Sequence, residues 1–256
     1  MPTEPTPFRS SGRFDAVVCD IDGCLSPESS DPMDAARLAR VAEHNRVARE
    51  RRDRPMVTVC SGRPQPFAEA MCRLIGNDAL PCIAENGVWL YHPADNRYDM
   101  DPRITEVHLA AVAAAEAWVR RDLGARGVTI QPGKAASISL YHADAAVLRT
   151  LEPVVRERFA RERWPLRVSM TWFYINCDLE FISKATALDR FMVVTGLTRD
   201  RLAGIGDTPA DAAIADRVSF FACPSNAAAE LKARAHYVSP FAETAGVLDV
   251  LERVSR

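Results

Sequence analysis

The sequence predicts an α/β protein in which a doubly wound parallel sheet carries an inserted α+β unit. Three observations predict this. Short apolar strands alternate with helices at both ends of the chain, which is typical of a parallel sheet. The middle has the order helix–strand–strand–helix–strand–strand, which suits an antiparallel sheet covered on one face. Polar and acidic residues directly follow several of the apolar strands.

The first part of the chain alternates strands and helices. Residues 14–19 (FDAVVC) are short, apolar and β-branched, as in a strand buried on both faces. The pattern continues with a helix at 34–52, a strand at 56–60, a helix at 66–75 and a strand at 82–84. This alternation favours parallel strands joined by right-handed crossovers.

The middle of the chain has a different pattern. We expect helices at 105–123 and 143–161, and strands at 128–130, 136–141, 166–170 and 173–177. These elements form the αββαββ inserted unit, for which the sequence predicts the bounds 91–179. The core domain then comprises 14–90 and 180–256, after a flexible tail at 1–13 that is rich in Pro and Ser.

The first pattern returns after residue 179. A helix at 184–195 ends before Gly196, a typical residue after a helix C-terminus. We expect strands at 202–205 and 218–222, and helices at 208–215, 227–235 and 244–254. These elements complete the parallel sheet.

Composition excludes several classes of protein. The chain has 256 residues, is 48% hydrophobic and has a net charge of −2, which argues against disorder and against a basic surface for nucleic acid. No apolar stretch approaches the length that spans a membrane. The seven cysteines form no C-x-x-C pair, which favours reduced thiols in a cytoplasmic protein. Whether the protein is a homodimer is left open.

Reactive residues follow four of the predicted strands. They are Asp20 and Asp22, Ser61, Glu85 and Asn86, and Asp207 and Asp211. Ligands of open parallel sheets bind at the carboxyl ends of the strands, so these residues are expected around one crevice. Four acids with only one or two basic partners imply a divalent cation, and oxygen ligands suit Mg²⁺. An isolated D-x-D is more often a strand-end turn that caps a helix, but Asp207 and Asp211 at another strand end argue against that interpretation here.

The motifs resemble those of the haloacid dehalogenase superfamily of phosphatases. Asp20-Ile21-Asp22-Gly23-Cys24-Leu25 is similar to the first motif, and Ser61 after a strand to the second. Lys184 at a helix start resembles the third motif, and 206–211 (GDTPAD) the fourth. The inserted unit resembles the type B form of the C2 cap found in sugar-phosphate phosphatases. The resemblance implies a Rossmann-like core.

The resemblance also implies a role for each residue. Asp20 would attack phosphorus and form an aspartyl-phosphate, and Asp22 would act as general acid and base. Mg²⁺ would be held by Asp20, Asp207 and the backbone carbonyl of Asp22, with Asp211 in support. Ser61 and the N–H of Gly62 would donate hydrogen bonds to phosphate, and Lys184 would neutralise its charge.

The chain departs from the family pattern at three positions. Ala210 stands where C2-capped members often have Asn, Ala185 where Gly usually follows the lysine, and Cys24 where Thr is frequent. Ala210 removes a polar group from the surroundings of the metal or the phosphate. None of the three changes removes a primary group.

Weaker candidates each have two interpretations. Arg63 could anchor phosphate or form a structural ion pair, and Asn86 could contact substrate or serve a turn. Lys134 could reach the site from a Pro-Gly-Lys loop or be a solvated surface lysine. The aromatic run Trp172, Phe173 and Tyr174 could stack on a sugar or be buried in the cap core.

Three functions fit these residues. The first is a Mg²⁺-dependent phosphomonoester hydrolase that acts on a phosphorylated sugar or related small metabolite. The second is a phosphomutase or phosphotransferase on the same fold, and the third a protein that binds sugar phosphates without catalysis. A dinucleotide enzyme is disfavoured, because Gly204-Ile205-Gly206 lacks the third glycine of that fingerprint.

Overall fold

The computed structural model describes residues 8–171 and 173–255. Its central sheet has the strand order β12-β11-β10-β1-β2, and every neighbouring pair is parallel. The strands are β1 (Ala16–Cys19), β2 (Met56–Val59), β10 (Leu202–Ile205), β11 (Phe220–Cys223) and β12 (Tyr237–Val238). The predicted parallel α/β core is confirmed, and β12 is an edge strand too short to stand out in the sequence.

A small antiparallel sheet extends the core beyond β2. Strand β3 (Cys82–Ala84) joins the parallel sheet through a Cys60–Ile83 bridge, and it pairs with β4 (Trp89–His92) and β5 (Arg97–Met100). The β4–β5 hairpin was not predicted from the sequence, because β5 (RYDM) is polar and partly exposed and so lacks the apolar run of the core strands. The predicted domain boundary between residues 90 and 91 lies inside β4, so the domain bounds remain a proposal.

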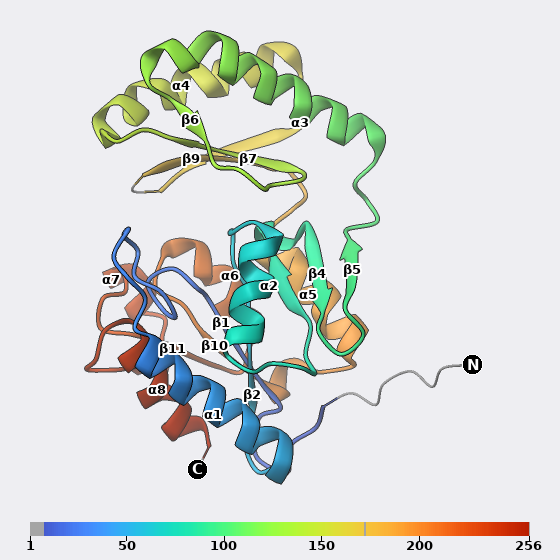
Figure 1. Ribbon diagram of the computed structural model, residues 1–256, viewed down its shortest axis with the longest axis vertical. Coiled ribbons are helices and arrows are strands. Elements are labelled where there is room, and N and C mark those ends of the chain that lie inside the picture. The colour runs from blue at the N-terminus through green and yellow to red at the C-terminus, as the bar shows by residue number, and fades with distance from the viewer. Residues whose placement is uncertain (1–7, 172, 256) are drawn as a thin grey trace.

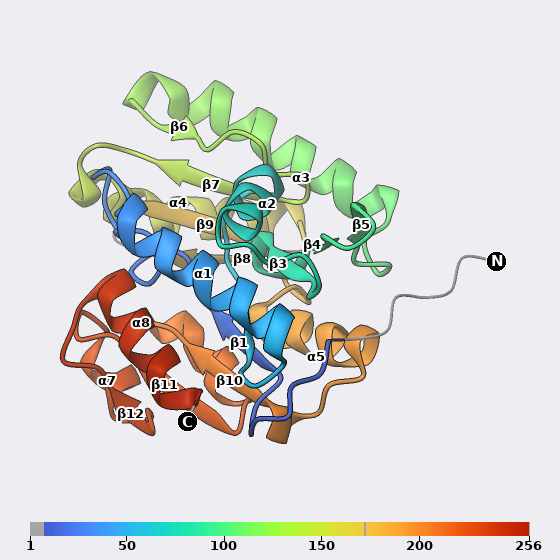
Figure 2. The same cartoon turned by 60° about the horizontal axis from the view of Figure 1, so that its bottom comes forward.

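Helices cover both faces of the parallel sheet (Figure 1, Figure 2). Val17 and Val59 pack in one hydrophobic cluster with helices α1 (Ala35–Arg51) and α8 (Glu243–Val254). Ala16 and Val18 pack in another cluster with α5 (Lys184–Thr195). This alternation is why β1 is apolar on both faces. The core helices are α1 (Ala35–Arg51), α2 (Gln65–Leu74), α5 (Lys184–Thr195), α6 (Ala212–Ala215), α7 (Ala229–Lys232) and α8 (Glu243–Val254), with 3₁₀ turns at Glu85–Gly87, Arg199–Arg201 and Pro209–Asp211.

The inserted unit, which we call the cap, has the predicted αββαββ order. Helix α3 (Glu106–Trp118) continues through a π turn (Val119–Leu123) and a 3₁₀ turn (Gly124–Arg126), and α4 spans Ala145–Glu162. The strands are β6 (Thr129–Ile130), β7 (Ser137–Tyr141), β8 (Leu166–Met170) and β9 (Tyr174–Leu179), in the antiparallel order β6-β7-β9-β8.

The two faces of the cap sheet differ in chemistry. Ile138 and Ile175 belong to the apolar cluster under α3 and α4. Side chains alternate along a strand, so Ser139 and Asn176 lie on the opposite face, which is turned toward the core in Figure 1. The cap therefore presents a polar surface to the carboxyl ends of the core strands.

The prediction of a flexible N-terminal tail is wrong for residues 8–13. Phe8 is only 3% exposed and packs in the core cluster that contains α5. Arg201 donates to the backbone oxygen of Ser10 at 2.7 Å and to the buried Asp15 carboxylate at 2.8 Å. One apolar residue in a Pro-rich segment gave no signal of this packing. Residues 1–7 lie outside the described residues.

The described residues include no membrane-spanning helix and no disulfide. Within the described residues, no helix has both the length and the apolar character needed to cross a membrane. All seven cysteines are free and buried, where a thiol packs as a small apolar group.

Candidate active site

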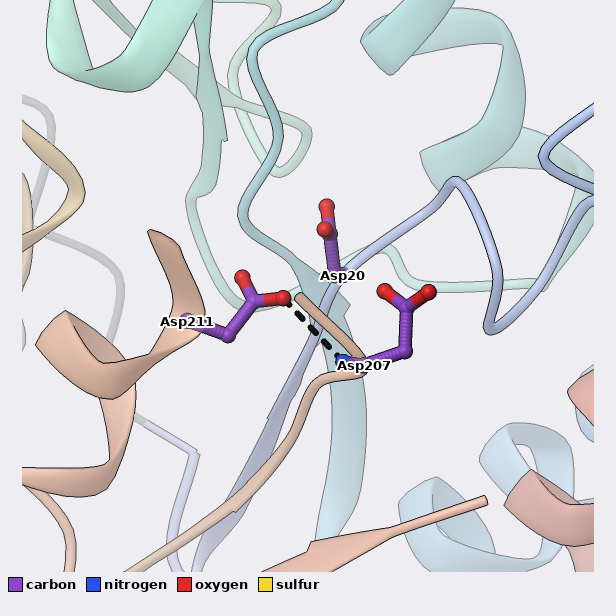
Figure 3. A group of neighbouring side chains, drawn as sticks. All are labelled: Asp20, Asp207 and Asp211. Carbon is purple, nitrogen blue, oxygen red and sulfur yellow. Dashed lines mark hydrogen bonds between the residues drawn. The ribbon is translucent and has the colours of Figure 1, made fainter. Parts of the chain in front are cut away.

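Three carboxylates meet at the carboxyl ends of β1 and β10. Asp20 follows β1 directly, while Asp207 and Asp211 lie on the loop and 3₁₀ turn after β10. One carboxylate oxygen from each lies within 4.8 Å of the others, and all three side chains are buried (Figure 3). The predicted convergence of these acids is therefore observed in the structure.

Lys184 lies between two of these acids. Its ammonium is 2.8 Å from Asp20 Oδ2 and 2.6 Å from Asp211 Oδ1. The helix α5 begins at Lys184 because the Ser183 side chain accepts a hydrogen bond from Thr186 N and caps the helix. Burial opposes the charge of Lys184, but the two carboxylates raise its pKa well above the usual value.

Asp211 uses both of its oxygens within the protein. Oδ2 accepts from Asp207 N at 3.1 Å (Figure 3). It also accepts from Thr208 N at 3.0 Å and from Thr208 Oγ1 at 3.1 Å. Oδ1 accepts from Lys184. Asp211 therefore orients both the Asp207 loop and Lys184. The position of Ala210, one residue before it, is exposed.

Asp207 is the acid with the fewest protein contacts. Its Oδ1 is buried and has no hydrogen-bond partner among the described residues. Gly23 lets the first-motif loop pass close to it, since a Cβ there would lie 1.9 Å from Asp207 Oδ2. Burial and the charge of Asp20 raise the pKa of Asp207 to about 8.

The pKa of Asp20 is raised as well. Burial and the charge of Asp211 raise the pKa of Asp20 to about 7, although Lys184 opposes the shift. Three buried carboxylates with one buried lysine thus leave uncompensated negative charge. Clustered carboxylate oxygens with an unpaired buried atom fit a hard divalent cation such as Mg²⁺.

The Asp22 side chain binds Arg63. It forms a two-pronged ion pair with Arg63, with Nη2–Oδ1 at 2.6 Å and Nε–Oδ2 at 2.8 Å. About a quarter of each side chain is exposed. Of the two interpretations of Arg63, the structure shows the ion pair. The backbone carbonyl of Asp22 as a metal ligand remains a prediction.

Ser61 and Gly62 form a tight loop after β2. Ser61 is 1% exposed, and its hydroxyl accepts a hydrogen bond from Arg63 N at 3.2 Å. Ser61 N donates to Ile83 O at 3.0 Å, which fixes the loop to β3. Their proposed role as phosphate donors is untested.

Asn86 and Lys134 both take part in contacts of the cap. Asn86 lies in a turn with φ 54° and donates to Asp178 on β9 at 3.2 Å. Lys134 is half-buried and donates to Ser139 on β7 at 2.6 Å, so the interpretation as a solvated surface lysine is wrong. Burial lowers the pKa of Lys134.

The aromatic run in the cap is not buried as a unit. Phe173 is 43% exposed, and Tyr174 is half-buried with its ring centroid 5.6 Å from that of Tyr141. Trp172 lies outside the described residues. The prediction of burial in the cap core is wrong for Phe173, because the turn between β8 and β9 carries it outward.

Sequence reasoning missed several polar residues near the site. Glu28 is half-buried, and burial with the nearby charges of Asp22 and Asp211 raises its pKa. Ser139, Asn176 and Asp178 line the core-facing side of the cap sheet. Their signal was the strict alternation in 137–141 (SISLY) and 174–178 (YINCD), which places every second side chain on one face.

The comparisons with known proteins agree with this architecture. A family model described as haloacid dehalogenase-like hydrolase matches residues 132–251. The chain has the haloacid dehalogenase-like hydrolase fold. The resemblance inferred from the sequence is confirmed, while the type B assignment of the cap remains a prediction. No curated protein matches the sequence.

Solved structures share the haloacid dehalogenase-like fold over nearly their whole length. A Bacteroides thetaiotaomicron haloacid dehalogenase-like hydrolase matches with TM-score 0.70 and 17% identity, covering 94% of this chain and 99% of that one. Thermoplasma acidophilum 0175 matches with TM-score 0.70 and 16% identity, covering 94% and 98%. The Synechocystis sucrose-phosphatase, solved with sucrose and phosphate, matches with TM-score 0.65 and 15% identity, covering 94% and 98%. At these identities the likeness concerns the fold.

Proposed function

We propose that this protein is a Mg²⁺-dependent phosphomonoester hydrolase that acts on a phosphorylated sugar or related small metabolite. The carrying observation is the buried cluster of Asp20, Asp207 and Asp211 with Lys184 between two of its members. This cluster joins a nucleophile, a cation site and a fixed positive charge at one sheet edge.

Asp20 and Asp207, with the carbonyl of Asp22, would hold the cation. Oδ1 of Asp207 has no hydrogen-bond partner among the described residues, and burial with neighbouring carboxylates raises the pKa of both acids. A bound cation would neutralise this crowded negative charge and displace the protons. Bound Mg²⁺ would supply positive charge to phosphate oxygens and keep both acids ionised.

Asp20 is the proposed nucleophile. Its attack on phosphorus forms an aspartyl-phosphate and releases the alcohol, and water then hydrolyses the acyl phosphate to regenerate the carboxylate. Lys184, 2.8 Å from Asp20 Oδ2, orients this carboxylate and offers positive charge to the phosphoryl oxygens. Ser61 and the N–H of Gly62 would donate hydrogen bonds to the other oxygens.

Asp22 is the proposed proton donor to the leaving oxygen and acceptor from the attacking water. Its pairing with Arg63 fixes the carboxylate orientation before substrate binds. Substrate phosphate competes for the same guanidinium, so Arg63 connects phosphate binding to release of Asp22.

The polar residues of the cap are suited to bind a leaving group that carries several hydroxyls. Ser139, Asn176 and Lys134 form a hydrogen-bonded polar group on the face turned to the core, with Ser139 Oγ donating to Asn176 Oδ1 at 2.6 Å. The paired rings of Tyr141 and Tyr174 lie on the same two strands. Hydroxyl, amide and aromatic groups together are suited to a sugar. A cytoplasmic location and a homodimer remain predictions.

The direct test is phosphate release from a panel of sugar phosphates and small phosphate esters, with Mg²⁺ or with EDTA. We expect release that needs Mg²⁺ and is lost in Asp20→Asn but kept in the control Asp95→Asn, an exposed loop residue. Label from ¹⁸O-water should enter the released phosphate, whereas a phosphomutase would return phosphoryl to sugar. Absence of release from every ester in the presence of Mg²⁺ would overturn the proposal.

A further inference from the structure

Two consecutive residues at the end of β3 have an unusual backbone. Glu85 and Asn86 have φ values of 49° and 54°, in the left-handed region. Residues other than Gly seldom adopt this region, because their side chains are strained there. Such a conformation persists only where the surrounding contacts stabilise it. The hydrogen-bond partners of the Glu85 and Asn86 side chains are therefore expected to stabilise this backbone.

The Glu85 carboxylate is bound by the cap. It is fully buried and accepts from Ala135 N at 3.0 Å to each oxygen, from Ala136 N at 3.3 Å and from Ser137 Oγ at 3.3 Å. Ala135 and Ala136 lie in the loop before β7 and Ser137 begins that strand, about fifty positions further along the chain than Glu85. Without these donors the buried carboxylate would have lost its hydrogen bonds to the cap, which is unfavourable, so they hold this loop on the core.

Asn86 binds the neighbouring cap strand. Its side-chain amide donates to Asp178 Oδ2 at 3.2 Å, and Asp178 is 2% exposed. Ser137 and Asp178 stand opposite each other in the β7–β9 pairing. Adjacent core residues thus bind two cap residues that form one cross-strand pair, which fixes the cap sheet in both position and direction.

The same two residues also hold the loop proposed to bind phosphate. Glu85 N donates to Arg63 O and Asn86 N donates to Ser61 O, each at 3.0 Å. Gly62 allows this approach, since a Cβ there would lie 3.1 Å from Asn86 Oδ1. One short segment therefore contacts residues 61–63 through its backbone and the cap through its side chains.

We propose that Glu85 and Asn86 are positioning residues that lock the cap sheet to loop 61–63. The lock sets a fixed separation between the phosphoryl group and the cap residues that bind the leaving group. Lys134 precedes the amides that Glu85 binds, so its position follows from the same contacts. The kinetic consequence rests on the proposed function, whereas the contact itself does not.

Hydrogen exchange of the full-length protein tests the contact without any substrate. In Glu85→Ala, the peptide covering 132–138 should exchange about tenfold faster or more, as expected when hydrogen bonds to a charged group are lost. Asn86→Gly suits the left-handed backbone and should retain the fold, and because it removes the contact with Asp178, exchange should rise in the peptide covering 174–180. The matched control Glu157→Ala, exposed on α4, should leave this peptide unchanged.

Kinetics give the second readout. Glu85→Ala and Asn86→Gly should lower kcat/KM about tenfold for the best sugar phosphate of the panel, and leave that for p-nitrophenyl phosphate within about twofold, because it carries no sugar for the cap to bind. Unchanged exchange at 132–138 in Glu85→Ala and at 174–180 in Asn86→Gly, or equal loss for both esters, would overturn the inference. If the wild type hydrolyses no ester, the proposed function is wrong. The exchange result still shows whether Glu85 and Asn86 hold the cap sheet.

Discussion

Lys184 balances the charge of the site. It is 6% exposed and lies between the carboxylates of Asp20 and Asp211, both buried. Removal of one member of a buried ionic group leaves the other charges uncompensated, which is far more costly than loss of a surface pair. Its contribution is therefore both structural and electrostatic.

Lys184→Met should lower stability by about 3–5 kcal/mol and kcat by about 10²–10³-fold. Urea unfolding without metal and phosphate-release kinetics with Mg²⁺ measure the two effects. Lys232→Met is the matched control, since the Lys232 ammonium bonds only a backbone oxygen, Ser225 O, among the described residues. Equal stability losses in the two variants would contradict the claim that Lys184 balances the charges of Asp20 and Asp211.

At the scale of elements, the start of α5 places the lysine. Ser183 caps this helix through Thr186 N, so Lys184 is its first residue. Asp144 caps α4 in the cap in the same way, accepting from Ala146 N at 2.7 Å. The two N-terminal capping interactions are chemically alike, but only the one at Ser183 lies next to the acids of the site.

Ser183→Ala and Asp144→Ala should each cost about 1 kcal/mol of stability. Only Ser183→Ala should also lower kcat, several-fold, because it loosens the turn that holds Lys184. Denaturant unfolding and steady-state kinetics on both variants measure this difference. A kcat unchanged in Ser183→Ala would show that the helix start does not position Lys184.

The packing of α1 on β2 should depend on pH through His44. Its Nε2 lies 2.8 Å from Pro55 O, and burial lowers its pKa. The unfolded chain then binds more protons than the folded one as pH falls below about 6.5, so acid reduces stability. Unfolding free energies at about pH 7.5 and about pH 5.5 should differ less in His44→Gln than in the wild type. The same pH dependence in both proteins would exclude this role.

At the scale of the whole molecule, a cation should stabilise the fold. The raised pKa values of Asp20 and Asp207 mean that the metal-free site holds protons near neutrality. Mg²⁺ must displace these protons, so its affinity should fall as pH drops below about 8. Binding to the folded chain alone then raises the apparent stability by mass action.

We expect Mg²⁺ at about 100 times its Kd to add about 2.7 kcal/mol, or about 5–10 °C in Tm. The shift should be larger at pH above 8 than near pH 6, and absent in Asp207→Asn. Thermal unfolding with Mg²⁺ or EDTA measures it. A full shift in Asp207→Asn would contradict the assignment of that residue to the metal.

The sequence predicted the elements that carry a local signal. The apolar strands β1, β2 and β10 and the acids after them could be recognised because a strand buried on both faces is apolar throughout. The contacts of Asp22 with Arg63 and of Glu85 with the cap could not be predicted, since each joins residues distant in the chain. The β4–β5 hairpin was missed because β5 (RYDM) is polar and partly exposed, without an apolar run.

The proposed mechanism depends most on Asp20 becoming phosphorylated during the reaction. The direct measurement is mass spectrometry of peptides from an acid-quenched reaction of the protein with Mg²⁺ and the best substrate of the panel. We predict one phosphoryl group on the peptide that contains Asp20, lost on treatment with hydroxylamine and absent in Asp20→Asn. An active enzyme whose quenched peptides carry no phosphoryl group at Asp20, or carry it at another residue, would contradict the mechanism.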